Sequence, residues 1–344
     1  MKVVTINLWC EPPDRHRRIR DATTHLLKLL PDVVFIQEIP QGDSRQYLKS
    51  RLGSRYEIFY SKNESTYPPM SYLPFVVVFL SMLLGFHMTL RKSLLASMLV
   101  SPRSISMLIS LVLSRKITDI NADFMGTGIL IKKDVIRRGK NKNVKIVSKP
   151  FSHQIRGYPV PESILSLGSW FKYYLQHTIG RPGVLMIRVE TEEEGSFVLA
   201  NCHLVISKDG STTNSTREVQ VEKVLNWVEE MRENRNDGIV IAGDFNAVPS
   251  GREQKKMKKA GYIESFQGRP MITWDPGFNS YTITHHEPRS QLDYVYVKQD
   301  HLKIMKARRV FDGKAGPIVS DHYGIEAELC RVAPRRTTTT RSQY

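Results

Sequence analysis

Short apolar runs that end in a polar side chain recur along the whole chain. Asn7 and Glu38 end two such runs near the start, and Asp244 and His322 follow two others far along the sequence. An apolar run of this length is typical of a buried strand, so its terminal polar residue is expected at the rim of a sheet, where a rigid scaffold can hold a site. These residues are therefore candidates for one site that is built from distant parts of the chain.

Strand patterns alternate with helical patterns on either side of one long apolar interruption. Apolar residues recur at helical spacing in some segments, and short alternating or continuous apolar runs bounded by turn residues fill others. The predicted strands cover residues 3–8, 32–39, 56–60, 126–132, 184–189, 197–204, 238–242, 292–297 and 325–329, and the predicted helices cover residues 15–30, 44–52 and 216–232.

Charge and cysteine content narrow the class of protein. Lys and Arg number 50 against 34 Asp and Glu, a net charge of +16 that favours a polyanionic partner, either nucleic acid or an anionic membrane face. A basic surface that is merely solvated is the alternative. The three cysteines, Cys10, Cys202 and Cys330, are far apart, which argues against a disulfide framework or a structural zinc site and fits a reducing compartment. Carboxylate, amide and imidazole groups without a cysteine cluster suit a hard cation such as Mg²⁺.

Six short motifs follow one another along the chain: Asn7, Gln37-Glu38, Asn201-x-His203, Gly243-Asp244-x-Asn246, Leu292-Asp293-Tyr294 and Ser320-Asp321-His322. Taken together and in this order, they resemble the endonuclease/exonuclease/phosphatase (DNase I-like) superfamily of metal-dependent phosphoesterases. The resemblance runs from residue 2 to about residue 329. It implies an α/β fold, a four-layer α/β sandwich of two packed mixed β-sheets flanked by helices. It also implies phosphoester hydrolysis by direct attack of water.

The resemblance assigns a metal site and a set of catalytic side chains. Glu38 is the implied principal ligand of Mg²⁺ (or Mn²⁺), with Asn7 and Asp321 beside it. The implied catalytic residues are His203, Asp244, Asn246, Asp293 and His322.

The implied catalytic roles follow the chemistry of each side chain. His322 contacts the scissile phosphate and Asp293 holds its imidazole in one tautomer. Asp244 activates or orients the attacking water, Asn246 donates to the developing oxyanion, and His203 is a second acid or phosphate ligand.

The sequence indicates the substrate less clearly than it indicates the reaction. Asn201 and Trp274 are the predicted substrate-binding residues, although the loop that carries Trp274 could also be a packed aromatic corner. The Asn-x-Trp pattern of Asn7 and Trp9 resembles that of neutral sphingomyelinases. The sequences of residues 31–38 and 272–275 instead resemble those of tyrosyl-DNA phosphodiesterases. We expect a membrane-associated, sphingomyelinase-like phosphodiesterase, with a nuclease or DNA-end phosphodiesterase as the alternative. A catalytically silent membrane-docked module is disfavoured because all the expected site residues are intact.

The interruption at residues 66–119 contains two apolar segments, 73–90 and 94–113. The first is about long enough to cross a bilayer. Because Glu38 precedes the interruption and Asp244 follows it, a single crossing would divide the site between two compartments. The segments are therefore expected to form a membrane hairpin or to lie in the interface. An interfacial position avoids the cost of placing Arg103 at mid-bilayer depth. A lid or core extension is the alternative.

The predicted organisation is a phosphoesterase domain at residues 1–65 and 120–331, an apolar insertion at 66–119 and a basic, disordered tail at 332–344. Residues 2–8 already alternate like a strand and no signal peptide precedes them, which predicts an intracellular protein. The expected partners are a phosphoester substrate, phospholipid or nucleic acid, and a membrane bound through residues 73–113. We expect a monomer with a cytosolic catalytic domain.

Overall fold

A computed structural model describes residues 1–9, 14–39, 42–61, 126–136, 144–150, 183–191, 195–205, 212–269, 271–282 and 288–332. All of these residues belong to one compact unit. In chain order its elements are β1 (Lys2–Asn7), α1 (Arg15–Leu29), β2 (Val33–Ile39), α2 (Asp43–Leu52), β3 (Tyr56–Tyr60), β4 (Gly126–Lys132), β5 (Lys145–Pro150), β6 (Gly183–Thr191), β7 (Gly195–His203), α7 (Thr212–Met231), β8 (Gly238–Asp244), α8 (Arg252–Lys259), β9 (Tyr262–Glu264), β10 (Asp293–Lys298), β11 (Leu302–Val310) and β12 (Gly324–Arg331).

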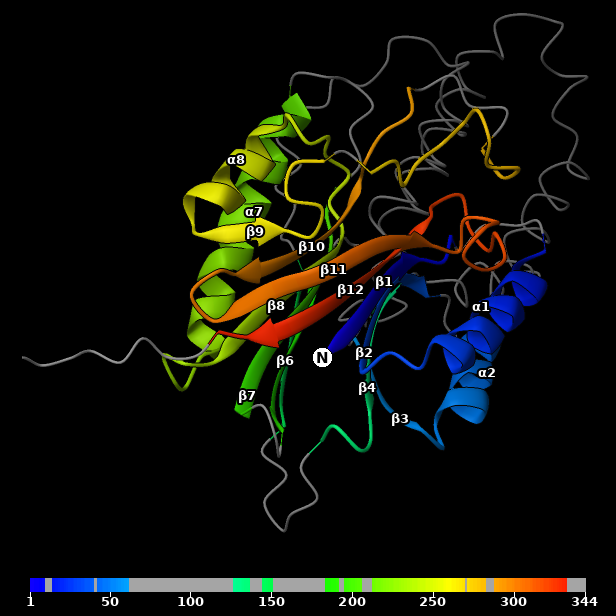
Figure 1. The fold of residues 1–344 in the computed structure, drawn as a ribbon, viewed down its shortest axis with the longest axis horizontal. Coiled ribbons are helices and arrows are strands. Elements are labelled where there is room, and N and C mark those ends of the chain that lie inside the picture. Colours follow the sequence, from blue (N-terminus) through cyan, green and yellow to red (C-terminus); the bar gives the residue numbers. More distant parts are fainter. Residues whose placement is uncertain are drawn as a thin grey trace, which may run out of the picture. The chain divides into compact units, whose positions relative to one another are not determined.

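The strands form two mixed sheets of six strands each. One has the order β11-β12-β1-β2-β4-β3 and the other the order β5-β6-β7-β8-β10-β9. Within the first, β1 runs parallel to β2, and within the second, β7 runs parallel to β8, while the other pairs are antiparallel. Strands from the first and last parts of the chain therefore lie side by side, as Figure 1 shows for β1 and β12.

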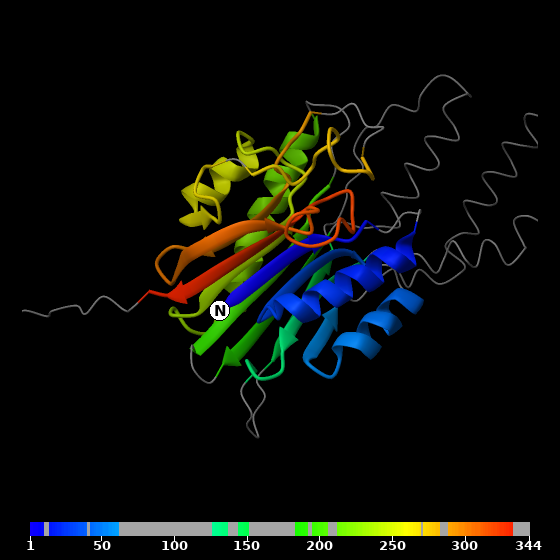
Figure 2. The same cartoon turned by 45° about the vertical axis from the view of Figure 1, so that its right-hand side comes forward.

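Alternation along the strands builds three apolar layers. On β1, Val3 belongs to the core between the two sheets, whereas Val4 on the opposite face packs under α1 and α2. On β8, Val240 faces the other sheet and Ile241 packs under α7 and α8. Figures 1 and 2 show these helix pairs on the outer sides of the two sheets. The predicted four-layer α/β sandwich is confirmed.

The structure adds elements that the sequence pattern did not predict. These are β5, α8, β9 and β11. On α8 only Met257 supplies an apolar side chain, so a helical apolar face is hardly visible in the sequence. β11 carries a register shift between Ile304 and Lys306, which breaks the alternation that would have identified it.

The predicted insertion at residues 66–119 lies outside the described residues, as does the tail from residue 333 onward. The domain boundaries at 65 and 120 therefore stay a prediction.

Within the part of the chain that the structure describes, no helix combines the length and apolarity needed to cross a membrane.

Candidate active site

The faces that pack between the two sheets change from apolar to polar at one end of the sandwich. On β1, Val3 lies in the inter-sheet core and Asn7, on the same face four residues later, is a buried amide. On β8, Val240 and Ala242 lie in this core and Asp244 follows on the same face. Because side chains alternate with a period of two, each strand delivers its polar residue to the same inter-sheet space.

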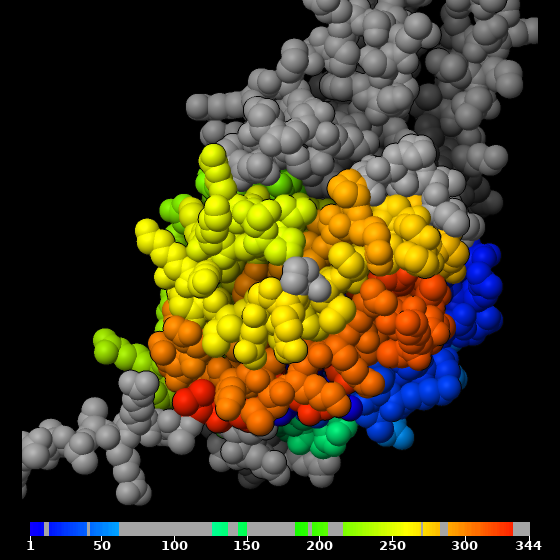
Figure 3. Space-filling model, turned by 45° about the horizontal axis from the view of Figure 1, so that its top comes forward, coloured from blue at the N-terminus to red at the C-terminus, as the bar shows by residue number. Residues whose placement is uncertain are grey.

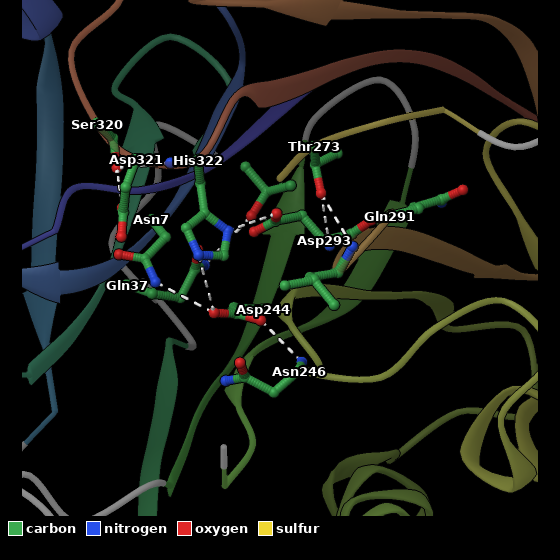
Figure 4. Close-up of polar contacts among 12 residues, drawn as sticks. Asn7, Gln37, Asp244, Asn246, Thr273, Gln291, Asp293, Ser320, Asp321 and His322 are labelled. Carbon is green, nitrogen blue, oxygen red and sulfur yellow. Dashed lines mark hydrogen bonds and ion pairs between the residues drawn. The ribbon is translucent and has the colours of Figure 1, made fainter. Parts of the chain in front are cut away.

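Strand register brings these ends together. Asp244 on β8 pairs with His203 on β7 and with Asp293 on β10, and Asn7 pairs with Gln37 across β1 and β2. His322 lies two residues before β12, the antiparallel neighbour of β1. Figure 4 shows the resulting convergence of side chains from both sheets. The site is thus built from strand ends that are far apart in the sequence.

Asn7 links the two sheets at the centre of the site. Its Nδ2 donates to Glu38 Oε1 at 3.0 Å and to Asp244 Oδ2 at 3.1 Å, and its Oδ1 accepts the backbone N–H of Trp9 at 2.9 Å. Glu38 has a left-handed backbone (φ 54°), an uncommon conformation for a glutamate, and lies within the register shift between Ile36 and Ile39 near the end of β2. The amide therefore holds a carboxylate of each sheet in a fixed relative position.

His322 and Asp293 form a buried pair on the opposite side of Asp244. His322 Nδ1 lies 2.8 Å from Asp293 Oδ2, and its Nε2 lies 3.8 Å from Asp244 Oδ2. Burial alone would lower the pKa of His322, but the nearby charges of Asp293, Asp244 and Asp321 outweigh it and hold that pKa well above its ordinary value. The ring of Trp274 packs edge-on against the imidazole, with 5.1 Å between centroids. His322 is thus positioned as a proton-bearing group.

The carboxylates of Glu38, Asp244 and Asp321 lie close together beside Asn7, and this concentration of acidic groups favours the binding of a cation. Burial raises the pKa of Asp321 to about 7, and the charges of Glu38 and Asp244 act in the same direction. Burial likewise raises the pKa of Asp244, and the charge of Asp293 adds to the effect. Burial and mutual repulsion disfavour the ionised form of these carboxylates, and a bound divalent cation would stabilise that form.

The donor atoms fit a hard divalent cation such as Mg²⁺ or Mn²⁺ on the oxygen-rich side. Glu38 and Asp321 carry carboxylate oxygens suited to such an ion, whereas Asn7 turns its Nδ2, and not its Oδ1, toward the carboxylates of Glu38 and Asp244. Among the described residues Asp244, Asp293 and His322 also place ligand atoms within 4.8 Å of one another. In that second group the Nδ1 of His322 lies 2.8 Å from Asp293 Oδ2, so this nitrogen is already engaged by a carboxylate. The placement of a cation beside Glu38, which the resemblance implies, stays a prediction.

His203 and Asn246 lie next to Asp244. His203 Nε2 is 3.8 Å from both Glu38 Oε1 and Asp244 Oδ2, so the imidazole lies between the two carboxylates. The backbone N–H of Asn246 donates to Asp244 Oδ1 at 2.8 Å, and its side-chain Nδ2 donates to the carbonyl of Leu204 at 3.0 Å. Both residues are therefore within the predicted site, and their predicted catalytic roles remain to be tested.

Asn201 has a different place from the one expected of a substrate-binding residue. It is fully buried; its Oδ1 accepts from Gln37 Nε2 at 2.6 Å and its Nδ2 donates to the carbonyls of Ile36 and Gly128 at 2.9 and 2.8 Å. A side chain with no exposed surface and these internal bonds ties the two sheets together. We reassign Asn201 to positioning Gln37 beneath the site.

Positioning residues that the motifs did not reveal hold the loops of the site. Thr273 Oγ1 accepts the backbone N–H groups of Leu292 and Asp293 at 2.9 and 3.1 Å. Buried Asn279 donates through Nδ2 to the carbonyls of Ser320 and Asp321 at 2.9 and 3.0 Å. A single asparagine or threonine in a loop carries no periodic signal, so these contacts were invisible in the sequence.

Arg18 is a buried cation under the same end of the sandwich. It is 1% exposed, and its guanidinium donates to the carbonyls of Leu8, Trp9 and Val319 at 2.7, 2.8 and 3.2 Å. It lies four residues before buried Ala22 on α1, so its position in the apolar stripe of that helix was the available signal.

Solved structures share this fold at low sequence identity. TDP2 from D. rerio, in a crystal structure with a single-strand DNA product, is 18% identical with a TM-score of 0.58, and the match covers 96% of this chain and 98% of that one. The catalytic domain of human Nocturnin, with a bound sulfate anion, is 15% identical with a TM-score of 0.59 over 96% and 94% of the two chains. No curated protein matches the sequence.

At such low sequence identity, the solved structures show only that the fold is shared. The family is instead shown by the match of the sequence to a family model. The model that describes the Endonuclease/Exonuclease/phosphatase family matches residues 4–322, a span that contains every site residue described above. Endonucleases, exonucleases and phosphatases, for which this family is described, are hydrolases that act on phosphoester bonds. This chain belongs to the Endonuclease/Exonuclease/phosphatase family.

Proposed function

We propose that this chain hydrolyses phosphodiester bonds in nucleic acid by direct attack of water, with Mg²⁺ or Mn²⁺ as its cofactor. The observation that carries the chemistry is the arrangement around Asp244 Oδ2, with the His322–Asp293 pair on one side and the Asn7–Glu38 contact on the other. One side offers a positive, proton-bearing group and the other a cation site. The scissile phosphate and its attacking water would bind against these groups.

Each side chain has a role that follows from its contacts. His322 keeps a proton at Nε2, because the three carboxylates raise its pKa, and it donates a hydrogen bond to a phosphoryl oxygen as charge develops there. Asp244, with a raised pKa, orients the attacking water and accepts its proton. Asp293 fixes the imidazole by its 2.8 Å contact with Nδ1. When bound, the cation offsets negative charge on the phosphoryl group in the transition state.

Charge supports nucleic acid as the substrate class. The net charge is +16, and exposed lysines lie on α8 and β11, among them Lys255, Lys258, Lys303 and Lys306. Figure 3 shows the yellow surface of α8 and the orange surface of β11 on one face of the molecule. Such a face attracts a phosphate backbone. The TDP2 structure that shares this fold contains a single-strand DNA product, which supports the same substrate class for this chain.

A substrate panel tests the proposal. The purified chain is incubated with a single-stranded DNA oligonucleotide, a 5′-phosphotyrosyl oligonucleotide, plasmid DNA and sphingomyelin vesicles, each with Mg²⁺ or with excess chelator. We expect Mg²⁺-dependent cleavage of at least one DNA substrate and none of sphingomyelin. Sphingomyelin hydrolysis without DNA cleavage would overturn the proposal and establish the phospholipid reading instead.

Membrane attachment through residues 73–113 is a second proposal, supported by the apolar length of residues 73–90. It places an intracellular, monomeric enzyme at a membrane surface with its catalytic domain in the cytosol. Replacing residues 66–119 by a short Gly/Ser linker should give a protein that no longer floats with liposomes in high salt, which strips electrostatic contacts but not apolar insertion. Flotation of the deletion variant would refute attachment through this segment.

A further inference from the structure

Two aromatic side chains lie at the edge of the site and take no part in the chemistry above. Trp9 follows β1 and Tyr281 belongs to the loop after Trp274; their ring centroids are 5.6 Å apart, with planes inclined by 55°. Both side chains are half-buried, in contrast to Tyr56 and Tyr294, which are fully buried in the core. We call Trp9 and Tyr281 the aromatic pair.

The site fixes the backbone of both residues of the aromatic pair. The N–H of Trp9 donates to Asn7 Oδ1 at 2.9 Å, and the N–H of Tyr281 donates to Asn279 Oδ1 at 3.0 Å. The same Asn279 holds the carbonyl of Asp321. Trp9 also has a left-handed backbone (φ 48°), a costly conformation for a bulky residue that persists only where its surroundings impose it. The aromatic pair is thus held next to the Asn7 and Asp321 side of the site.

A buried cation lies beneath both rings. The guanidinium carbon of Arg18 is 4.7 Å from the Trp9 centroid and 5.5 Å from the Tyr281 centroid. Because Arg18 is 1% exposed while the rings are half-buried, the exposed parts of the rings face away from it. A second cation on the same rings would meet the repulsion of this arginine, so a quaternary ammonium head group is a poor ligand for them. A neutral, flat aromatic group meets no such penalty.

We propose that the aromatic pair is a stacking subsite for a nucleobase next to the scissile phosphate. This inference rests on the proposed function, because the base that would stack on the aromatic pair is part of a nucleic-acid substrate. Base stacking on aromatic side chains tolerates any sequence, since every base has a π-face. The subsite therefore selects a base-bearing phosphodiester over a choline phospholipid without selecting one sequence.

The test compares two probes that differ only in their bases. One is a phosphorothioate single-stranded DNA oligonucleotide, which resists cleavage, and the other has the same backbone with every base removed. Their dissociation constants are measured with Mg²⁺ for the wild type and for Trp9→Ala, Trp9→Phe and Trp227→Ala. The bond from Trp9 to Asn7 comes from the backbone, so alanine keeps it. Trp227 lies on α7, with Lys149 5.0 Å over its ring and its side chain packed against the apolar layer beneath that helix, and is a matched control outside the site.

The expected result is a base preference that depends on Trp9. The wild type binds the base-bearing probe about tenfold or more tightly than the abasic one, the scale of stacking on one aromatic residue. Trp9→Ala removes most of that preference, while Trp9→Phe and Trp227→Ala retain it. An unchanged preference in Trp9→Ala, or equal binding of both probes by the wild type, would overturn the stacking subsite and leave the proposed function standing. A wild type that binds neither probe would instead refute the nucleic-acid function itself.

Discussion

Replacing Asp293 by asparagine isolates the charge that holds the catalytic histidine in its protonated form. The substitution keeps the size of the side chain 2.8 Å from His322 Nδ1 and removes only the negative charge. The pKa of His322 should then fall, because the carboxylate of Asp293 is the largest of the charges that raise it. Loss of a well-placed charged hydrogen-bond donor to developing negative charge costs about 10²- to 10³-fold in kcat, or about 3 to 4 kcal/mol of transition-state stabilisation. The fold should survive, because asparagine has the same size and keeps an oxygen that can accept a hydrogen bond from His322 Nδ1.

The assay is the pH profile of kcat on a DNA oligonucleotide, combined with NMR titration of the His322 ring. In the variant the alkaline limb of the profile should move to lower pH, since a lower pKa means that the proton is lost earlier as pH rises. Asp237→Asn is the matched control, a buried carboxylate 3.2 Å from Arg188 at the opposite end of β8; it should lower stability and leave the alkaline limb in place. Wild-type kcat and an unmoved limb in Asp293→Asn would refute the reasoning.

Three further outcomes are expected. Glu38→Ala should reduce activity to about one-hundredth or less, because the cation supplies several kcal/mol of charge stabilisation; full activity of this variant in chelator would contradict the metal mechanism. The pKa of Asp321 is about 7, so a cation that binds below this pH must displace its proton. The Mg²⁺ affinity measured by calorimetry should therefore rise about tenfold per pH unit up to about pH 7 and then level off. An affinity that does not change with pH would argue against Asp321 as a ligand. A Cβ on Gly243 would lie 1.9 Å from the Cys202 carbonyl at a backbone φ of 135°, so Gly243→Ala should cost about 3 kcal/mol or more in urea unfolding. Gly268→Ala, which has open space around its Cβ, should cost clearly less.

Apolar continuity made most of the fold predictable. β3 and β4 have the predicted bounds, and β2 begins one residue after its predicted start, because their runs of apolar residues end at clear turn or polar signals. β8 continues to Asp244, two residues past its predicted end, since Gly243 pairs with Tyr294 on β10 despite its unusual backbone. Edge elements such as β11 and the polar helix α8 bury too few side chains to leave such a pattern.

The candidate site was predictable where strand ends supply it and not where loops do. Asn7, Asp244 and Asp293 follow from strand parity, because each continues an apolar inward face. The alternation of side chains along a strand does not predict that Asn201 hydrogen-bonds to backbone carbonyls of the other sheet, because those bonds depend on how the two sheets pack. Nor could it reveal Asn279, whose contacts with the Asp321 loop are set by tertiary packing alone.

Cleavage of a single-stranded DNA oligonucleotide by the wild type and by His322→Gln, each with Mg²⁺ and after chelation, tests the central claim most directly. The residue lies at the meeting point of Asp244, Asp293 and Trp274, and its Nε2 is the proposed hydrogen-bond donor to the phosphoryl group. The account predicts product from the wild type with Mg²⁺, and little or none from chelated wild type or from the variant under either condition. Equal cleavage by His322→Gln with Mg²⁺, or undiminished cleavage by chelated wild type, would contradict it.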